Sequence, residues 1–301
     1  MPIHSAFAQP EGERGPAGTA ARGAIHDLSY RHWSGEWTSH PYRWWVITRH
    51  GIRLLAGRRW FVALMILSAL PFVVRCVLLY LSTVVGSLPL LRINAKFFLD
   101  FLNQQTVFVF PIAVFSGAGL IANDLKANAL QIYLSKPITR RDYLLGKLGV
   151  LVFFLGIPTL IPGLLLFVLA VLFRSDLDFL RQNYWVAGSI AAYSVAIVFL
   201  YALIMLALSS LTRSSRFAGM NFVGLIVFSN ILAVILGGIL RTRRLAWVSV
   251  SNNLTQLGDV LFRSDLRHPS PLWISLAVVA GLAVGSAWLA HRRVQAVEVV
   301  Q

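Results

Sequence analysis

The sequence predicts an all-α integral membrane protein with six transmembrane helices and an N-terminal amphipathic interfacial helix. Hydrophobic residues make up 57% of its 301 residues, and the mean hydropathy is +0.69. Only 13% of the residues are charged, against about 25% in a typical soluble domain. The apolar residues form blocks of twenty or more, which a soluble core does not produce. These features exclude a soluble enzyme and a mainly disordered chain, and the blocks are too long and too uniform for a β-barrel.

Residues 1–40 predict a disordered cytoplasmic tail, because they lack apolar periodicity and contain few aliphatic residues. They are rich in residues that interrupt regular structure: Pro2, Pro10, Gly12, Gly15, Pro16, Gly18 and Gly23. No apolar segment follows their first charges, so we do not expect a secretory signal. Residues 291–301 predict a second cytoplasmic tail after the last span.

Residues 41–59 predict an amphipathic helix in the plane of the lipid headgroups. On a helical wheel, one broad face collects the apolar residues Trp44, Trp45, Ile47, Ile52, Leu54 and Leu55. Arg49, His50 and Arg53 fall on the opposite face, and Val46 does not fit the pattern. Tryptophan and arginine on such a helix are typical of an interfacial element. The alternative is that the segment is only the basic flank of the first span.

Six apolar spans form the predicted transmembrane domain of residues 60–290. We place them at residues 60–85, 99–121, 148–173, 185–210, 218–240 and 272–290, and call them spans one to six. Each is long enough to cross about 30 Å of hydrocarbon at 1.5 Å per residue. The polar residues Asn103, Gln104 and Gln105 lie near the start of span two and weaken its apolar pattern. Pro158 and Pro162 predict a kink in span three, because two backbone donors are missing there.

The charge distribution predicts the topology. The chain holds 27 Lys and Arg against 12 Asp and Glu, a formal net charge of +15. Six spans place both termini on one side, and 17 of the basic residues fall on that side against nine on the other. The richer side is predicted to be cytoplasmic. Basic residues that flank spans account for the net charge, so we expect no nucleic-acid partner.

The loop at 122–147 carries the most distinctive pattern. A short polar helix is followed by a stop at Lys136-Pro137, since the residue before a proline is pushed out of the helical region. Thr139 is then a candidate N-cap for a helix that continues into span three. The result is a compact helix–turn–helix with charge at its tip, which suits docking into a groove on another protein. The alternative is an ordinary basic loop.

This loop resembles a known family. The run Ser135-Lys-Pro-Ile-Thr-Arg-Arg-Asp-Tyr143, followed by Gly146-Lys147, is similar to the permease subunits of ATP-binding cassette (ABC) transporters of the ABC type-2 membrane family. Asn128-Ala129 stands where those proteins usually have Gly-Thr. The segments 252–259 and 291–298 resemble the family as well, so the resemblance extends over roughly residues 45–298.

The resemblance implies a transmembrane permease subunit of an exporter in a prokaryotic plasma membrane. Its implied partners are a separate cytoplasmic ABC ATPase subunit, a second permease copy or a similar permease, and membrane lipids. The implied ATPase-coupling residues are Asp124, Lys126, Ser135, Lys136, Pro137, Arg140, Arg141, Tyr143 and Lys147. The interfacial helix, with Trp44, Trp45, Arg49 and Arg53, would be the connecting helix beside them. The rival interpretation is a membrane anchor or assembly protein that recruits cytoplasmic partners without transport.

The residues themselves predict no catalytic, cofactor or metal site in this chain. A GxxxxGK[ST] phosphate loop is missing from the sequence, so ATP and Mg²⁺ are expected on the partner ATPase. Cys76 is the single cysteine, which excludes an intrachain disulfide. The histidines are irregularly spaced. Nothing in the sequence selects a substrate.

Two further features predict functional elements. Arg75 is an ionisable residue within span one, and such residues are candidates for a translocation path. The alternative is that its side chain extends to the outer interface. Pro71 precedes it by four residues and predicts a bend. In the loop at 241–271, which is either external or re-entrant, Leu254, Leu257 and Leu261 share one face of a predicted short amphipathic helix.

Overall fold

The computed structural model describes residues 42–85, 94–130, 138–174, 177–242, 244–268 and 270–294. All of them belong to one compact unit, Pro41–Gln301. The predicted tail at 1–40, the Ser135-Lys-Pro137 turn and the C-terminal tail from residue 295 onward lie outside the described residues.

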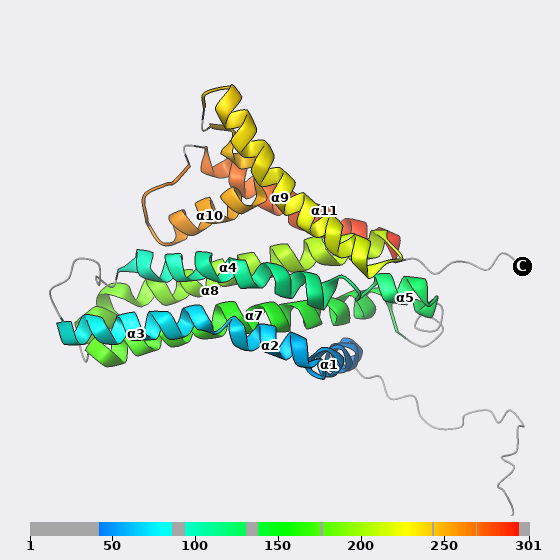
Figure 1. Cartoon of the computed structure of the whole chain (residues 1–301), viewed down its shortest axis with the longest axis horizontal. Helices are drawn as coiled ribbons and strands as arrows, with labels where there is room; N and C mark the ends of the chain where they lie inside the picture. The colour runs from blue at the N-terminus through cyan, green and yellow to red at the C-terminus, as the bar shows by residue number, and fades with distance from the viewer. Residues whose placement is uncertain are drawn as a thin grey trace, which may run out of the picture. The chain divides into compact units, whose positions relative to one another are not determined.

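The described residues fold into helices (Figure 1). An initial helix, α1 (Arg43–Ala56), precedes the first span, which comprises α2 (Arg59–Leu67) and α3 (Leu70–Val85). The elements that follow are α4 (Ala95–Gly117), α5 (Ala122–Lys126), α7 (Arg140–Arg174), α8 (Leu177–Leu211), α9 (Ser215–Ile239), the 3-10 helix η2 (Arg244–Val248), α10 (Val250–Leu261) and α11 (Leu272–Arg293).

Six helical segments within the described ranges are long and apolar enough to cross a membrane, as predicted. They are Arg59–Ser82, Ala95–Lys126, Arg140–Phe173, Arg181–Leu211, Ser215–Ile239 and Leu272–Arg293. Each overlaps one of the six spans expected from the sequence over most of its length. Because spans alternate in direction, α1, α5 and the start of α7 lie at one end of the helices, which we call the α1 side. The opposite end is the α10 side.

The prolines act differently in spans one and three. Pro71 cannot donate a backbone hydrogen bond, and span one is broken just before it, at Ser68 and Ala69 between α2 and α3. The predicted bend at Pro71 is therefore confirmed. In span three, α7 continues as one helix through both Pro158 and Pro162, so the kink predicted there does not interrupt the helix.

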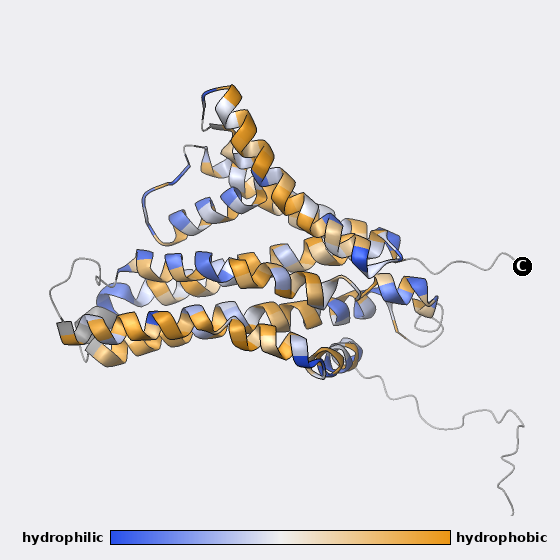
Figure 2. Cartoon of the chain, viewed as in Figure 1, coloured by the Kyte–Doolittle hydropathy of each residue, from blue (hydrophilic) through white to orange (hydrophobic). Residues whose placement is uncertain are grey.

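Protein burial is unequal among the spans. Helices α4, α7 and α8 pack side by side, and two thirds of the most apolar window of span four is buried. Span five has 22% of its window buried and span six only 6%. Figure 2 shows that α9 and α11 are nevertheless mostly apolar along their length. Exposed apolar surface of this extent is what a lipid-facing helix presents.

Helix α1 packs on α7 through the centre of its apolar face. Leu55 is buried in this contact and Ile47 is partly buried. Only the flanks of the face, at Trp45 and Leu54, remain exposed, together with the misfit Val46. The apolar stripe is therefore shared between protein and surroundings.

The segment 241–271 folds back along span five. At its turn, Ser249 Oγ donates to Asn230 Oδ1, and the Val250 amide donates to Ser229 Oγ at 3.4 Å. Ser229 and Asn230 lie well inside α9, which ends at Ile239. The predicted short helix is α10, and Leu254 on its predicted face is buried. Of the two interpretations left open, this geometry corresponds to the re-entrant one.

Candidate functional site

Three side chains join α5 to α7 at the α1 side. The Lys147 ammonium lies 2.7 Å from Asp124 Oδ2, and the Tyr143 hydroxyl donates to the same oxygen at 2.7 Å. The Lys147 nitrogen also lies 5.3 Å from the centre of the Tyr143 ring, which is fully buried. We call Asp124, Tyr143 and Lys147 the α5 clasp. It holds the short helix α5 against α7 across the intervening loop.

The start of α7 is capped as predicted. The Thr139 hydroxyl accepts from the Asp142 amide at 3.1 Å, while Asp142 Oδ2 accepts from the Thr139 amide at 3.1 Å and from its hydroxyl at 2.7 Å. This reciprocal arrangement is a capping box, which satisfies two otherwise unpaired backbone donors. It fixes the direction in which the loop returns into span three.

A serine of span four fixes the turn that leads into α5. Ser209 Oγ accepts from the Ile121 and Ala122 amides, each at 3.1 Å, and donates to the Ala118 carbonyl at 3.0 Å. Ser209 is fully buried. These contacts satisfy the backbone between α4 and α5, where helical partners are missing. The base of the loop is thus anchored to span four as well as to span three.

Asn128 explains one departure from the family pattern. Its φ is +50°, in the left-handed region that favours glycine, and asparagine is among the residues that tolerate it best. Asn128 can therefore hold the same left-handed turn that a glycine would hold.

Helix α1 approaches α7 closely because glycines line the contact. Thr48 Oγ1 lies 2.9 Å from the Gly146 carbonyl and 3.1 Å from the Trp44 carbonyl. A Cβ built on Gly146 would meet Ile47 Cβ at 2.7 Å and the Trp44 carbonyl oxygen at 2.9 Å. A Cβ on Gly149 would lie 2.6 Å from Thr48 Oγ1. Small residues permit such backbone proximity, so α1 and the first turns of α7 form one packed unit.

The predicted coupling residues thus divide into two groups with different positions. Asp124, Tyr143 and Lys147 point inward and form the clasp. Lys126, Arg140 and Arg141 are exposed at the same end of the protein, and Ser135, Lys136 and Pro137 lie outside the described residues. On α1, Arg49 and Arg53 are exposed, Trp44 is partly buried, and Trp45 contacts Trp44 edge-on at 5.9 Å.

Sequence reasoning missed Thr48, Gly149 and Ser209. Thr48 lies on the otherwise apolar face of α1, and that mismatch was a usable signal. The spacing of Gly146 and Gly149, which places both on one face of a helix, was another. Ser209 carries no comparable signal, because its three backbone partners come from a different span.

Arg75, the predicted residue of a translocation path, is half-buried in α3. Its guanidinium carbon lies 4.8 Å from the centre of the Phe97 ring, an ordinary cation–π distance. Phe97 is in the first turn of α4, so Arg75 lies toward the α10 side of span one.

A second charged cluster lies at the α10 side. The Arg267 guanidinium contacts Asp100 Oδ1 at 3.1 Å through Nη2 and Asp259 Oδ1 at 3.3 Å through Nε. Asp259 is fully buried and also accepts from the Arg267 amide at 3.1 Å. These contacts connect the end of α10 to α4.

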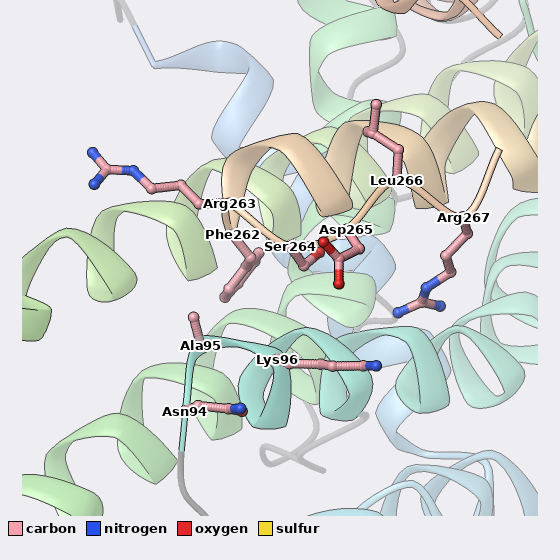
Figure 3. Close-up of a pocket in the computed structure, with 9 residues that line it drawn as sticks. All are labelled: Asn94, Ala95, Lys96, Phe262, Arg263, Ser264, Asp265, Leu266 and Arg267. Atoms are coloured by element: carbon pink, nitrogen blue, oxygen red, sulfur yellow. The ribbon is translucent and has the colours of Figure 1, made fainter. Parts of the chain in front are cut away.

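An open cavity of about 480 Å³ adjoins this cluster (Figure 3). It is lined by Asn94, Ala95, Lys96, Phe262, Arg263, Ser264, Asp265, Leu266 and Arg267. None of the site residues predicted from the sequence lies in its lining.

Six apolar spans, with an anchored cationic loop at one end, define a multi-pass membrane protein of the transporter type. The chain belongs to the ABC-2 family of transporter proteins, whose family profile matches residues 45–265. That match includes α1, the α5 clasp and α10, and it confirms the resemblance seen in the sequence. Among curated proteins, none matches the chain. The protein is therefore a membrane-embedded permease component of an ABC transporter.

Proposed function

We propose that the chain is the permease subunit of an exporter and that a separate cytoplasmic ATPase subunit docks on its α1 side. The observation that carries this proposal is the α5 clasp, which presents an anchored loop with exposed Lys126, Arg140 and Arg141. Exposed cations on a positioned element suit an acidic groove on a partner. ATP and Mg²⁺ would be bound by that partner.

The contacts at the α1 side supply a route for the motion of the ATPase. A force on the loop reaches α7 through the Asp124–Lys147 ion pair and the capped residue Thr139. Helix α1 would move with α7, because the glycine contacts leave no space between them. The route is a rigid-body one, in which one element displaces another without a change in its own fold.

The proposal includes a topology and a stoichiometry. Both termini would be cytoplasmic, in a prokaryotic plasma membrane, because the α1 side carries the larger share of Lys and Arg. A second permease copy, or a similar permease, would complete the transporter. The exposed cations of α1 and its flanking Trp45 and Leu54 would contact headgroups.

The test is co-purification with the ATPase. We expect Lys126→Glu/Arg140→Glu/Arg141→Glu to lower the amount of ABC ATPase recovered with the full-length chain at least tenfold, because like charges would then oppose an acidic groove. The matched control is Lys96→Glu/Arg181→Glu/Arg241→Glu, which makes the same charge change at exposed residues of the α10 side. We expect the control to retain the ATPase.

Recovery of the ATPase with the first variant would overturn the docking site. If no ATPase co-purifies with the unmodified chain, the permease proposal fails and the membrane-anchor interpretation gains support. Equal loss in both triple variants would show that the interaction depends on overall charge and not on this loop.

A further inference from the structure

One buried amide of span two bonds to points in spans one and three where the helical hydrogen bonding is interrupted. Gln105 lies on α4 and is fully buried. Its side-chain nitrogen donates to the Ser68 carbonyl at 2.8 Å and to the Pro158 carbonyl at 2.7 Å. Since both partners are carbonyl oxygens, the amide must present its NH₂ group to them. A residue that seemed to weaken span two in the sequence thus bonds to spans one and three.

Both carbonyls belong to points where a proline disturbs a helix. In α7, the Pro158 carbonyl would normally accept from the amide four residues later, but that residue is Pro162, which has no N–H. Ser68 lies at the break between α2 and α3, three residues before Pro71. Gln105 therefore supplies a hydrogen-bond donor at two helix defects at once. Inside a membrane such carbonyls need an internal partner.

The two defects lie at the same depth. Spans one and three run in the same direction, and Phe61 meets Phe154 at 4.9 Å between ring centres on the α1 side. Tyr80 meets Phe173 at 6.3 Å toward the α10 side. In both ring contacts the residue of span three lies 93 positions after its partner in span one, and Pro158 lies 90 positions after Ser68. The two spans therefore keep nearly the same register on both sides of the break in span one.

We infer that Gln105 joins the bend points of spans one and three, so that their α1-side halves move together. The α1-side halves are already tied to each other by the Phe61–Phe154 contact and to α1 by the glycine packing. With one amide bonded to both helix defects, a displacement of α7 at the coupling loop moves the α1-side half of span one with it. The use of this motion in transport rests on the proposed function, whereas the shared bend point does not.

The first experiment uses the full-length chain alone, in lipid nanodiscs, with Cys76 replaced by serine. Pairs of spin labels at Val62 and Leu145, and at Val77 and Leu172, report the α1-side and α10-side halves of spans one and three; all four positions are exposed. In the unmodified chain we expect one narrow distance distribution for each pair. Gln105→Leu should broaden the Val62–Leu145 distribution at least twofold, because each half-span then bends separately.

The matched control is Gln104→Leu, at an exposed neighbour of the same residue type, which should leave both distributions narrow. If Gln105→Leu fails to fold, Gln105→Asn keeps the amide but shortens its reach, and it should broaden the same distribution. A distribution as narrow as in the unmodified chain, in either folded variant, would overturn the inference.

A double-mutant cycle tests the hydrogen bond to Pro158. Gln105→Leu should lower the melting temperature by about 5 °C, because two buried carbonyls lose their donor. Pro162→Ala restores the N–H that the Pro158 carbonyl lacks, so the same Gln105→Leu change should cost about half as much in that background. An equal loss in both backgrounds would overturn the role of the Pro158 carbonyl.

The last experiment adds the ATPase with Mg–ATP and vanadate. We expect the distance between labels at Leu145 and Leu211 to shift while the Val62–Leu145 distance stays constant. In the Gln105→Leu variant, we expect the Val62–Leu145 distance to change as well. A change in the Val62–Leu145 distance in the unmodified chain would overturn the coupled motion. If nucleotide has no effect at any label pair, the proposed ATPase coupling fails, whereas the nanodisc result for the chain alone still decides the shared bend point.

Discussion

At the α1 side, α1 and α5 are held to α7 by glycine packing and one partly buried ion pair. At the α10 side, α10 is held by amides and hydroxyls in addition to the Arg267 ion pairs and the close packing of Gly258. Gly146 and Gly149 bring α1 against α7, and Asp124 pairs with Lys147. At the other end, Gln256 Oε1 accepts from Ser270 Oγ at 2.7 Å and from Ser275 Oγ at 2.6 Å. Close packing resists deformation, whereas a set of hydrogen bonds can exchange partners.

The difference suggests a division of labour within the permease. The α1 side has the contacts expected of a part that transmits a force without changing its own shape. The α10 side has a re-entrant helix held by polar side chains, next to two spans with little protein burial. Motion received at the first end would be accommodated at the second.

The largest effect is expected at Gly146. Gly146→Val should destabilise the protein by about 3 kcal/mol. Its Cβ would lie 2.7 Å from Ile47 Cβ, 2.9 Å from Ile47 Cγ2 and 2.9 Å from the Trp44 carbonyl oxygen. Thermal unfolding in detergent and the yield of monodisperse protein measure this. The control is Gly156→Ala in the same helix, where a Cβ would meet nothing within 4 Å, and it should unfold at the same temperature or higher. Wild-type stability of Gly146→Val would show that α1 is not held tightly.

The second-largest loss of stability is expected at the Asp124–Lys147 ion pair. Asp124→Ala should cost roughly 2 kcal/mol, since it removes the ion pair from Lys147, of which only 11% of the side chain is exposed. Tyr143→Phe removes a single hydrogen bond to the same carboxylate and should cost about 1 kcal/mol. Thermal unfolding ranks the two variants. The reverse order would mean that the tyrosine, and not the ion pair, anchors α5.

At the α10 side a smaller loss is expected from a carboxylate that is more deeply buried than Asp124. Asp259→Asn should cost about 1.5 kcal/mol, because Arg267 keeps Asp100 as a second partner. Asp265→Asn, at an exposed carboxylate of the same loop, serves as the control and should have no effect. A cost above that of Asp124→Ala would reverse the comparison between the two ends.

The smallest effect concerns the turn after α5. Asn128→Val should cost about 1 kcal/mol, because a β-branched residue is strained at a φ of +50°. Asn128→Gly should match or exceed the original stability. Ala127→Val is the control, one residue away at a φ of −85°. Melting temperatures of the three variants distinguish strain in the turn from a general intolerance of larger side chains.

The sequence was sufficient to predict what depends on local patterns. Span lengths follow from hydropathy, the Thr139 cap from its position after Lys136-Pro137, and the break in span one from Pro71. Gln105, in contrast, looked like a weakness of span two, because its partners are carbonyls 37 and 53 residues away. The Asp124–Lys147 pair and the glycine contacts of α1 likewise join segments that no periodicity relates. Periodicity tells which face of α1 is buried but not that α7 covers it.

The weak burial of span six makes the bilayer a structural component of this protein. Helix α11 has 22 residues, about 33 Å at 1.5 Å per residue. Exposed Trp273 lies at one end and Trp288 near the other, where the Arg292 guanidinium stacks on it at 5.0 Å. Aromatic and basic residues at both ends anchor a helix at the two membrane surfaces. These anchors, together with the packing of α11 on α8, therefore set the tilt of α11 within the hydrophobic thickness of the membrane.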